Sequence, residues 1–465
     1  MTKIAINPIS RIEGDGKVTI YLDDQGRVEK ARFQILEFRG FEEFVKGRLI
    51  WEMPLITSKI CGICPIPHHL AAVKAVEAAL NVNEIPPAAT LLRKMLLDAG
   101  SIQDHTLHFL YLAFPDFIYN ASTPPEKRGI TGLLADNPGL VKRAIFLRKC
   151  GVTLAEKIGA HSIYPVTAIP GGMSRPLDKR EVPELTAMVN QALVYAEEVV
   201  QQAWKVSSTL PEKMPSTLST SFMSLVAPNG EVAHYDGAIR VMDKDSRTLY
   251  TFRPADYEEF IEEDTERDTW SKFPFLKKLG SLEGLYRVGP LARCNMATHL
   301  HTPRAGKWLQ QLKAGAAGQP LQSIFYYHVC RCIELIYHLE CVLEGLADPL
   351  LTSAEVRIPV QRAAGEGVGV VEAPRGTLFH HYRCRNNGEV EMANMIVPTT
   401  HNNQAMNKTV LEVASACVKD GAISEAGKQK IEMAVRSYDP CLSCATHSWD
   451  AQTGVAVELV RRTYS

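Results

Sequence analysis

The stretch KICGICPIPHH, residues 59–69, decides the fold because it contains two closely spaced thiols, Cys61 and Cys64. A second CxxC pair, Cys441 and Cys444, lies in DPCLSCATH, residues 439–447. Each CxxC can bring two sulfurs onto one ion, and two pairs together complete a four-thiolate site of the kind that soft metals prefer. The sequence therefore predicts that the two ends of the chain meet at a buried metal centre.

Two other interpretations of the thiol pairs fit the sequence less well. Structural zinc is the usual explanation when two CxxC pairs lie ~15 to 20 residues apart, but here they lie at opposite ends of a long chain. A dithiol oxidoreductase would place its CxxC beside a strand–helix–strand unit, which is missing here. A structural-zinc scaffold stays as the alternative. His68, four residues after Cys64, is expected to hold a thiolate sulfur by a hydrogen bond.

The bulk composition excludes several classes of function. The chain has 465 residues, 46% of them hydrophobic, with 51 Lys+Arg against 52 Asp+Glu. This balance gives no net field to attract nucleic acid or an anionic membrane. The N-terminus lacks a signal peptide, and no stretch approaches the ~20 apolar residues that span a bilayer. Eleven cysteines are too sparse for a disulfide scaffold. We therefore expect a cytoplasmic protein without a membrane span.

Hydrophobic periodicity predicts an α+β fold that is predominantly helical. Alternation predicts a β-hairpin over 17–36, and glycine-rich, strand-like sequence predicts a second β-rich piece over 365–400. Helical periodicity begins after Pro67 and recurs over 87–114, 184–210, 321–346 and 411–435. With no linker or repeat, we expect one unit with a β-rich part (1–60), a long-helix bundle core (61–364), a β-rich and helical part (365–447) and an extension (448–465). The active site is expected to be buried between the two CxxC loops.

Further motifs resemble the large subunit of nickel–iron hydrogenases. They occur in the family's order over nearly the whole chain. The motifs are RIEG (11–14), RGFE (39–42), CGIC (61–64), DHTLHF (104–109), PGGM (170–173), EAPRG (372–376), IVPTT (396–400) and DPCLSCATH (439–447).

The resemblance implies a Ni–Fe centre for reversible cleavage of H2. Cys61 and Cys441 would bind nickel alone, while Cys64 and Cys444 would bridge nickel to an iron that carries CO and cyanide. Thiolates stabilise oxidised nickel. The resemblance also makes Glu13 in RIEG the carboxylate that carries the proton away.

The resemblance assigns roles to other polar residues as well. Pro374 and Arg375 in EAPRG would lie against the diatomic ligands of iron, with Asp104 and Asp439 positioning the guanidinium. An ion-pair network that only supports the fold is the alternative, and both roles could coexist. Glu42, His447 and a backbone carbonyl near Met395 would hold a magnesium or similar divalent ion.

The sequence departs from the family's pattern at a few positions. Lys59 replaces an arginine, Asp15 a histidine and His401 a tryptophan, and none of these changes removes a metal ligand. Family members are usually made with a C-terminal extension that is clipped after the residue matching His447. This implies a maturation chaperone and an endopeptidase, and residues 448–465 would be the extension.

The segment YRVGPLARCN, residues 286–295, looks most like the cytoplasmic multisubunit branch linked to NAD(P), ferredoxin or deazaflavin. The chain shows no dinucleotide-binding motif, and Cys330 and Cys341 are interpreted as buried helix residues. Electrons would therefore leave through a small iron–sulfur subunit towards a flavin-containing diaphorase and NAD(P). A deazaflavin- or heterodisulfide-reductase-linked hydrogenase is the alternative. The related quinone-site subunit of respiratory complex I would lack the four cysteines.

Overall fold

A computed structural model describes residues 2–209, 216, 218–266, 268–316, 318–361 and 364–447. The expected C-terminal extension, 448–465, and the expected last residue of the helix over 184–210 lie outside the described residues. Within the described part, no helix combines the length and the apolar character needed to cross a membrane.

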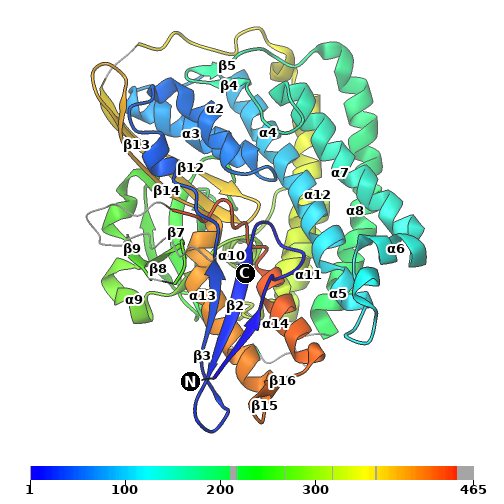
Figure 1. Ribbon diagram of the computed structural model, residues 1–465. Helices are drawn as coiled ribbons and strands as arrows, with labels where there is room; N and C mark the ends of the chain where they lie inside the picture. The colour runs from blue at the N-terminus through cyan, green and yellow to red at the C-terminus, as the bar shows by residue number, and fades with distance from the viewer. Residues whose placement is uncertain are drawn as a thin grey trace, which may run out of the picture.

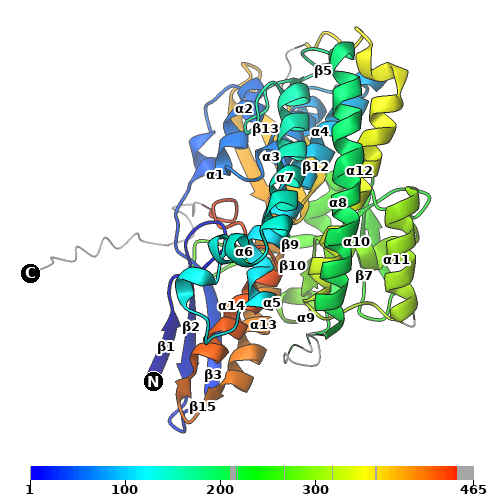
Figure 2. The same ribbon diagram turned by 90° about the vertical axis from the view of Figure 1, so that its right-hand side faces the viewer.

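Long helices form the centre of the molecule and run side by side in Figure 2. Helix α12 packs against α4 and α8, and α4 also packs against α7. Most residues of α12 are buried, which marks it as the central helix. The helices predicted over 87–114, 184–210 and 321–346 are thus present, and the first continues into a π-helical segment, Leu107–Ala113. The bounds are α4 Pro87–Thr106, α7 Pro138–Gly159, α8 Val182–Thr209 and α12 Tyr326–Ala347.

Two small antiparallel sheets lie near the two CxxC loops (Figure 1). The N-terminal sheet contains the predicted hairpin and has the order β1-β2-β3. Helix α13 packs on β3, which joins the C-terminal part of the chain to the N-terminal sheet. The second sheet has the order β12-β13-β14. The strands are β1 Thr2–Ile6, β2 Gly16–Leu22, β3 Val28–Ile35, β12 Gly365–Ala373, β13 Gly376–Cys384 and β14 Val390–Ile396.

Glycines on β12 allow helix α3, Pro65–Ala79, to lie directly on the second sheet. Gly365, Gly367 and Gly369 alternate along the strand and therefore share one face. A Cβ on Gly369 would lie 2.2 Å from the carbonyl oxygen of Ala71, and a Cβ on Gly365 would lie 1.9 Å from that of Ala79. Because α3 begins directly after Cys64, this close approach sets the position of the first CxxC loop.

A third sheet, within residues 221–287, was not predicted from the sequence. It has the order β11-β6-β7-β8, with β11 parallel to β6, and the hairpin β9-β10 follows β8 in the chain. Its strands are short and interrupted by turns, so periodicity over longer windows did not reveal them. The bounds are β6 Ser221–Val226, β7 Ala238–Met242, β8 Thr248–Phe252, β9 Ile261–Thr265, β10 Lys272–Leu276 and β11 Tyr286–Arg287.

The predicted single helix over 411–435 is wrong. The chain instead forms α13, Pro398–Cys417, a tight hairpin of β15, Val418–Lys419, with β16, Ala422–Ile423, and then α14, Glu425–Ser437. Asp420 and Gly421 have φ angles of 50° and 73°, which an α-helix does not accept. Ser424 then caps α14 through a hydrogen bond from the Gly427 N–H.

Shorter elements complete the chain. They are α1 Phe41–Phe44, α2 Met53–Thr57, α5 Pro115–Ile118, α6 Ile130–Asp136, β4 Ala168–Ile169, β5 Gly172–Met173, α9 Gly280–Glu283, α10 Pro290–Met296 and α11 Pro303–Gly315. The predicted fold, a helical core with small N- and C-terminal sheets and a buried site between the CxxC loops, is confirmed.

Candidate metal centre

The first CxxC loop is shaped by the start of α3. Cys61 has an extended backbone, and Cys64 is the N-cap residue of the helix, followed by Pro65 at its first position. The backbone N–H groups of Ile63 and Cys64 point at Cys61 Sγ, at 3.2 and 3.5 Å. These donors favour a thiolate at Cys61.

The second CxxC loop follows α14 and lies against the N-terminal segment. Cys441 pairs with Glu13 in a parallel bridge, and the Leu442 N–H donates to the Glu13 carbonyl at 3.1 Å. The Cys441 N–H donates to Thr399 Oγ1 at 2.9 Å. Segments from both ends of the chain therefore hold this loop beside the first one.

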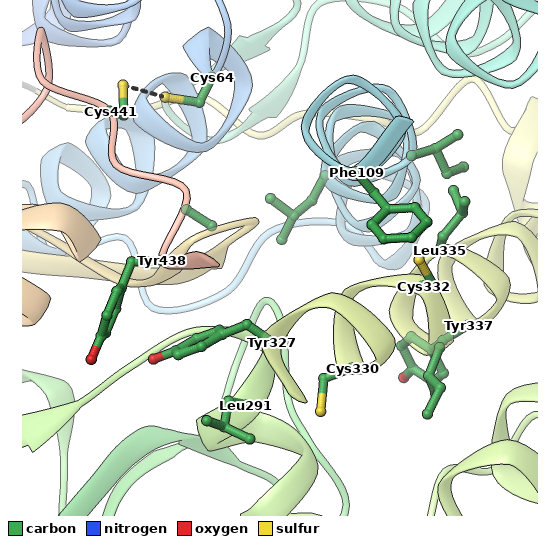
Figure 3. Close-up of a cluster of buried hydrophobic side chains, with 14 of the residues drawn as sticks. Cys64, Phe109, Leu291, Tyr327, Cys330, Cys332, Leu335, Tyr337, Tyr438 and Cys441 are labelled. Atoms are coloured by element: carbon green, nitrogen blue, oxygen red, sulfur yellow. Dashed lines mark hydrogen bonds between the residues drawn. The ribbon is translucent and has the colours of Figure 1, made fainter. Parts of the chain in front are cut away.

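The two loops bring four buried thiols together. Their sulfur atoms lie 2.9 Å apart for Cys441–Cys444, 3.3 Å for both Cys61–Cys441 and Cys64–Cys444, and 3.9 Å for Cys64–Cys441. Figure 3 shows the Cys64–Cys441 contact. Four sulfurs around an ion at ~2.3 Å would lie about 3.7 Å apart. The observed spacing therefore fits a shared metal centre.

The electrostatics of the thiols point to the same conclusion. Burial raises the pKa of Cys441 and Cys444 well above that of an ordinary thiol. Hydrogen bonds from Cys441 and Cys444 lower the pKa of Cys61. Four adjacent buried thiolates would repel one another, and a bound cation removes this penalty. We therefore expect all four cysteines to be thiolates only when a metal ion is bound.

The other cysteines of the central helix lie elsewhere. Figure 3 shows Cys330 and Cys332 on α12, apart from the Cys64–Cys441 pair. Both are buried, and burial raises their pKa. Among the described residues, no second group of cysteines is placed to hold a metal ion.

His68 contacts the thiol cluster as expected from the sequence. Its Nε2 lies 3.4 Å from Cys444 Sγ, and its Nδ1 lies 3.0 Å from Nε2 of His380. His380 Nδ1 in turn meets the Tyr382 hydroxyl. Burial lowers the pKa of His68 to about 4, so the ring is neutral at neutral pH. His380 was not predicted from the sequence, and it is buried on β13, where most side chains are buried.

Arg375 lies between β12 and β13 and joins three parts of the site. It donates through Nη1 to Asp104 Oδ2 at 2.7 Å, through Nη2 to Asp439 Oδ1 at 3.1 Å and through Nε to the Asp439 carbonyl at 2.8 Å. Burial raises the pKa of both carboxyl groups, that of Asp439 to about 7, and the guanidinium opposes the shift. The predicted association of Arg375 with both acids is present.

A small apolar cavity separates Arg375 from the sulfurs. Pro67, Ala373, Leu378 and Pro398 line it together with Arg375, Thr399 and three of the cysteines. Pro374 is not among its lining residues, and its carbonyl instead accepts a hydrogen bond from Arg293 at 2.9 Å. An apolar wall with one cation suits small ligands with weak acceptor atoms.

Glu13 is half-buried beside the second loop. Its Oε2 accepts the Ser443 N–H at 3.0 Å, and its Oε1 lies 2.5 Å from Ser443 Oγ. The same hydroxyl lies 3.3 Å from Oε2 of Glu37, whose side chain is 26% exposed. Ser443, which the sequence analysis did not single out, thus links Glu13 to a carboxylate that solvent reaches.

Glu42, His447 and Met395 also meet. Glu42 Oε2 lies 3.2 Å from His447 Nδ1, and Glu42 Oε1 accepts the Met395 N–H at 2.9 Å. The Lys272 ammonium lies 3.5 Å from Glu42 Oε1. Burial would raise the pKa of Glu42, but Lys272 and His447 outweigh it and lower the pKa to about 2. A carboxylate and an imidazole suit a cation that keeps much of its water.

Two departures from the hydrogenase pattern have local partners. Lys59 Nζ lies 3.5 Å from the centre of the Tyr164 ring, a cation–π contact in place of an arginine's hydrogen bonds. His401 Nδ1 lies 2.6 Å from the Tyr286 hydroxyl. Both residues are therefore accommodated without disturbing the thiols.

Comparison with known protein families decides the identity of the fold. The family described as nickel-dependent hydrogenase matches residues 39–135 and 166–447. This chain belongs to the nickel-dependent hydrogenase family. A further family, described as HoxL-like, matches residues 3–38 of this hydrogenase. The predicted relationship with nickel–iron hydrogenase large subunits is confirmed. A structural-zinc scaffold is no longer needed to explain the thiol pairs.

Named relatives cover almost all of this hydrogenase. The vhc F420-non-reducing hydrogenase chain of Methanococcus voltae is 38% identical and covers 96% of this chain and 95% of its own. NAD-reducing hydrogenase HoxS subunit beta of Cupriavidus necator is 37% identical, with the same shares. A crystal structure of an NAD+-reducing [NiFe]-hydrogenase in the H2-reduced state is 39% identical, has a TM-score of 0.93 and covers 96% of this chain and 100% of that one.

Proposed function

We propose that the chain is the catalytic large subunit of a cytoplasmic, multisubunit nickel–iron hydrogenase that cleaves H2 reversibly. The observation that carries this proposal is the convergence of four buried thiols from the two ends of the chain. When bound, the Ni–Fe pair would supply the Lewis acidity and the redox capacity for splitting H2. The chain's own residues would hold the metals, shape the pocket and move the proton.

Cys61 and Cys441 would bind nickel alone, and Cys64 and Cys444 would bridge both metals. The apolar cavity beside them would take the CO and cyanide ligands of iron, with the Arg375 guanidinium as donor to cyanide nitrogen. Asp104 and Asp439 would hold Arg375 in place, and His68 would donate to the sulfur of Cys444. Pro374 would act through its backbone, which Arg293 anchors.

One of the two thiolates that would bind nickel alone, Cys61 or Cys441, would take up the proton released from H2, and Glu13 would carry it away. The Glu13 backbone pairs with that of Cys441, a proposed nickel ligand, and its carboxylate contacts Ser443 two residues further on. Ser443 Oγ contacts both Glu13 and the partly exposed Glu37. A hydroxyl can donate one proton while accepting another, so these contacts provide a route towards solvent.

A hydrated magnesium ion would lie between Glu42 Oε2 and His447 Nδ1. Met395 would contribute its carbonyl, while its N–H keeps the other Glu42 oxygen in place. The Lys272 ammonium lies near that oxygen, so the magnesium ion would bind through the other Glu42 oxygen, Oε2. Soft thiolates are absent from this donor set, which favours a hard ion.

Electrons would pass to a small iron–sulfur subunit, then through a flavin-containing diaphorase to NAD(P), or to ferredoxin. The NAD-reducing relatives support this assignment. The alternative is a deazaflavin- or heterodisulfide-reductase-linked complex, and the relatives named F420-non-reducing hydrogenases argue against its deazaflavin-linked form. We further propose that a chaperone and an endopeptidase mature the C-terminal end. Adding NAD+, NADP+ and ferredoxin separately to the native complex under H2 would distinguish the acceptors.

The test of the proposed function is a pair of cysteine variants of the native complex. Cys441→Ser should lose nickel and H2-dependent dye reduction, because one ligand of the centre is gone. Cys417→Ser, at the half-buried end of α13, should keep both. Equal loss in the two variants, or full activity in Cys441→Ser, would refute the assignment.

A further inference from the structure

A second cluster of metal-binding side chains lies between the central helices, and it shares no residue with the thiol centre. His105 from α4 faces Glu334 and His338 from α12, one turn apart. Possible ligand atoms of the three residues all lie within 4.8 Å of one another. All three residues are buried. Two imidazoles and a carboxylate on packed helices are a common ligand set for transition metals.

The orientation of His338 is set by a second carboxylate. His338 Nδ1 lies 2.7 Å from Oδ1 of Asp98, which lies two turns before His105 on α4. With Asp98 as acceptor, the proton is on Nδ1, which leaves the lone pair of Nε2 available to a metal ion. Nε2 is buried and has no hydrogen-bond partner in the described part of the protein. A buried acceptor without a partner is costly, and a metal ion would satisfy it.

The charges around the cluster favour a cation. The Arg293 guanidinium donates two hydrogen bonds to the Glu334 carboxylate, at 2.6 and 2.7 Å, and one to Glu372 at 2.7 Å. The other partners of Glu372 are the Leu225 N–H and the Thr377 hydroxyl, both donors, so Glu372 acts as a carboxylate.

Three carboxylates, those of Asp98, Glu334 and Glu372, surround the cluster together with the Arg293 guanidinium. Arg331 on α12 acts electrostatically on both Asp439 and Glu334, while its guanidinium donates to the carbonyls of Tyr327 and Ser437. With both guanidinium groups counted, the three carboxylates still leave one negative charge. Burial raises the pKa of Asp98 and Glu372, and a bound cation would oppose this shift.

A cleft leads from solvent to residues beside the cluster. It has a volume of about 420 Å³ and is lined by Asp98, His234, His301, Tyr337 and Glu344 among others. The side chains of His301 and Glu344 are 43% and 55% exposed, which places them at its mouth. Of the lining residues, His234 has its ring 4.5 Å from the His338 ring, and its Nε2 is buried without a described partner. The cleft therefore ends at Asp98 and His234, which are direct neighbours of His338.

We propose that His105, Glu334 and His338 form a second metal site that binds a divalent ion of the zinc class and fastens α4 to α12. A tetrahedral zinc ion at ~2.0–2.1 Å would place nitrogen and oxygen ligands about 3.4 Å apart. The candidate ligand atoms now lie at most 4.8 Å apart, so binding the ion would shorten the longest of these distances by at most about 1.4 Å. Three protein ligands would leave one of the four tetrahedral positions open.

Cobalt binding to the purified native complex tests this site, because Co²⁺ in an imidazole–carboxylate site has visible absorption that Zn²⁺ lacks. After treatment with a chelator that leaves the Ni–Fe infrared bands intact, and with excess Mg²⁺ present to fill the Glu42–His447 site, we expect one Co²⁺ to bind per chain and Zn²⁺ to displace it. Asp98→Asn should weaken binding about 10- to 100-fold, as loss of a carboxylate behind a ligating histidine does. His338→Ala should abolish it. His161→Ala, at an exposed histidine, should bind Co²⁺ like the unaltered complex.

Anomalous diffraction keeps the proposal testable if the variants do not fold. Crystals of the unaltered complex soaked in Zn²⁺ should show a peak between the three side chains at the zinc edge. No peak there, or Co²⁺ binding that Asp98→Asn and His338→Ala leave unchanged, would overturn the proposal.

Discussion

Replacing Gly369 by alanine tests how the fold positions the first thiol pair. The added Cβ would lie 2.2 Å from the Ala71 carbonyl oxygen and 2.3 Å from the Ala75 nitrogen, where ordinary contacts begin at 3.4 Å. Both atoms belong to the backbone of α3, so no side chain can rotate away. The helix must retreat by about 1 Å, and overpacking of this kind costs about 3 kcal/mol.

The unfolding temperature should fall accordingly. Unfolding entropy of ~2.1 cal/mol/K per residue gives about 1 kcal/mol/K for a chain of 465 residues, so 3 kcal/mol corresponds to ~3 °C. Nickel content should fall as well, because α3 begins at Cys64 and carries His68.

Gly315→Ala is the matched control for calorimetry and metal analysis. Apart from its own helix backbone, no atom of the described residues lies within 4 Å of the added Cβ, and alanine favours helix, so the unfolding temperature should stay the same or rise slightly. If Gly369→Ala matched this control in unfolding temperature and nickel content, the proposed role of the glycine face would be wrong.

Three further substitutions test the polar residues around the thiols. Glu13→Gln keeps an acceptor for the Ser443 N–H but cannot carry a proton, so H/D exchange under H2 should fall about 100-fold or more while the infrared bands of CO and cyanide remain. Ser443→Ala breaks the contact with Glu37 but leaves the backbone donor to Glu13, so exchange should slow about tenfold, the effect of one ~1.4 kcal/mol hydrogen bond; an unchanged rate would rule out this route. Arg375→Lys cannot reproduce the three hydrogen bonds of the guanidinium, and turnover with a dye should fall about 100-fold with nickel and iron retained; unchanged turnover would limit Arg375 to a structural role.

The candidate centre was largely predictable because its ligand residues lie within short sequence motifs. CxxC spacing constrains where sulfurs can go, and proline after Cys64 marks the start of a helix. The long helices were predictable for a similar reason, since α4, α8 and α12 each contain many turns of regular apolar spacing.

Features that depend on tertiary contacts could not be predicted. The strands β6 to β11 are two to six residues long, too short for a periodic pattern. The break between α13 and α14 rests on two residues, Asp420 and Gly421, within otherwise helical sequence. Contacts with residues far away in the chain define the roles of His380, Ser443 and the cluster around His338, so their roles could not be predicted.

X-ray absorption at the nickel edge, measured on the purified native complex, tests the central claim most directly. We expect nickel surrounded by four sulfurs at roughly 2.3 Å with iron beyond them, and loss of this signal in Cys441→Ser. Nickel bound without sulfur, or a stoichiometric zinc ion on the four cysteines in place of nickel and iron, would contradict it.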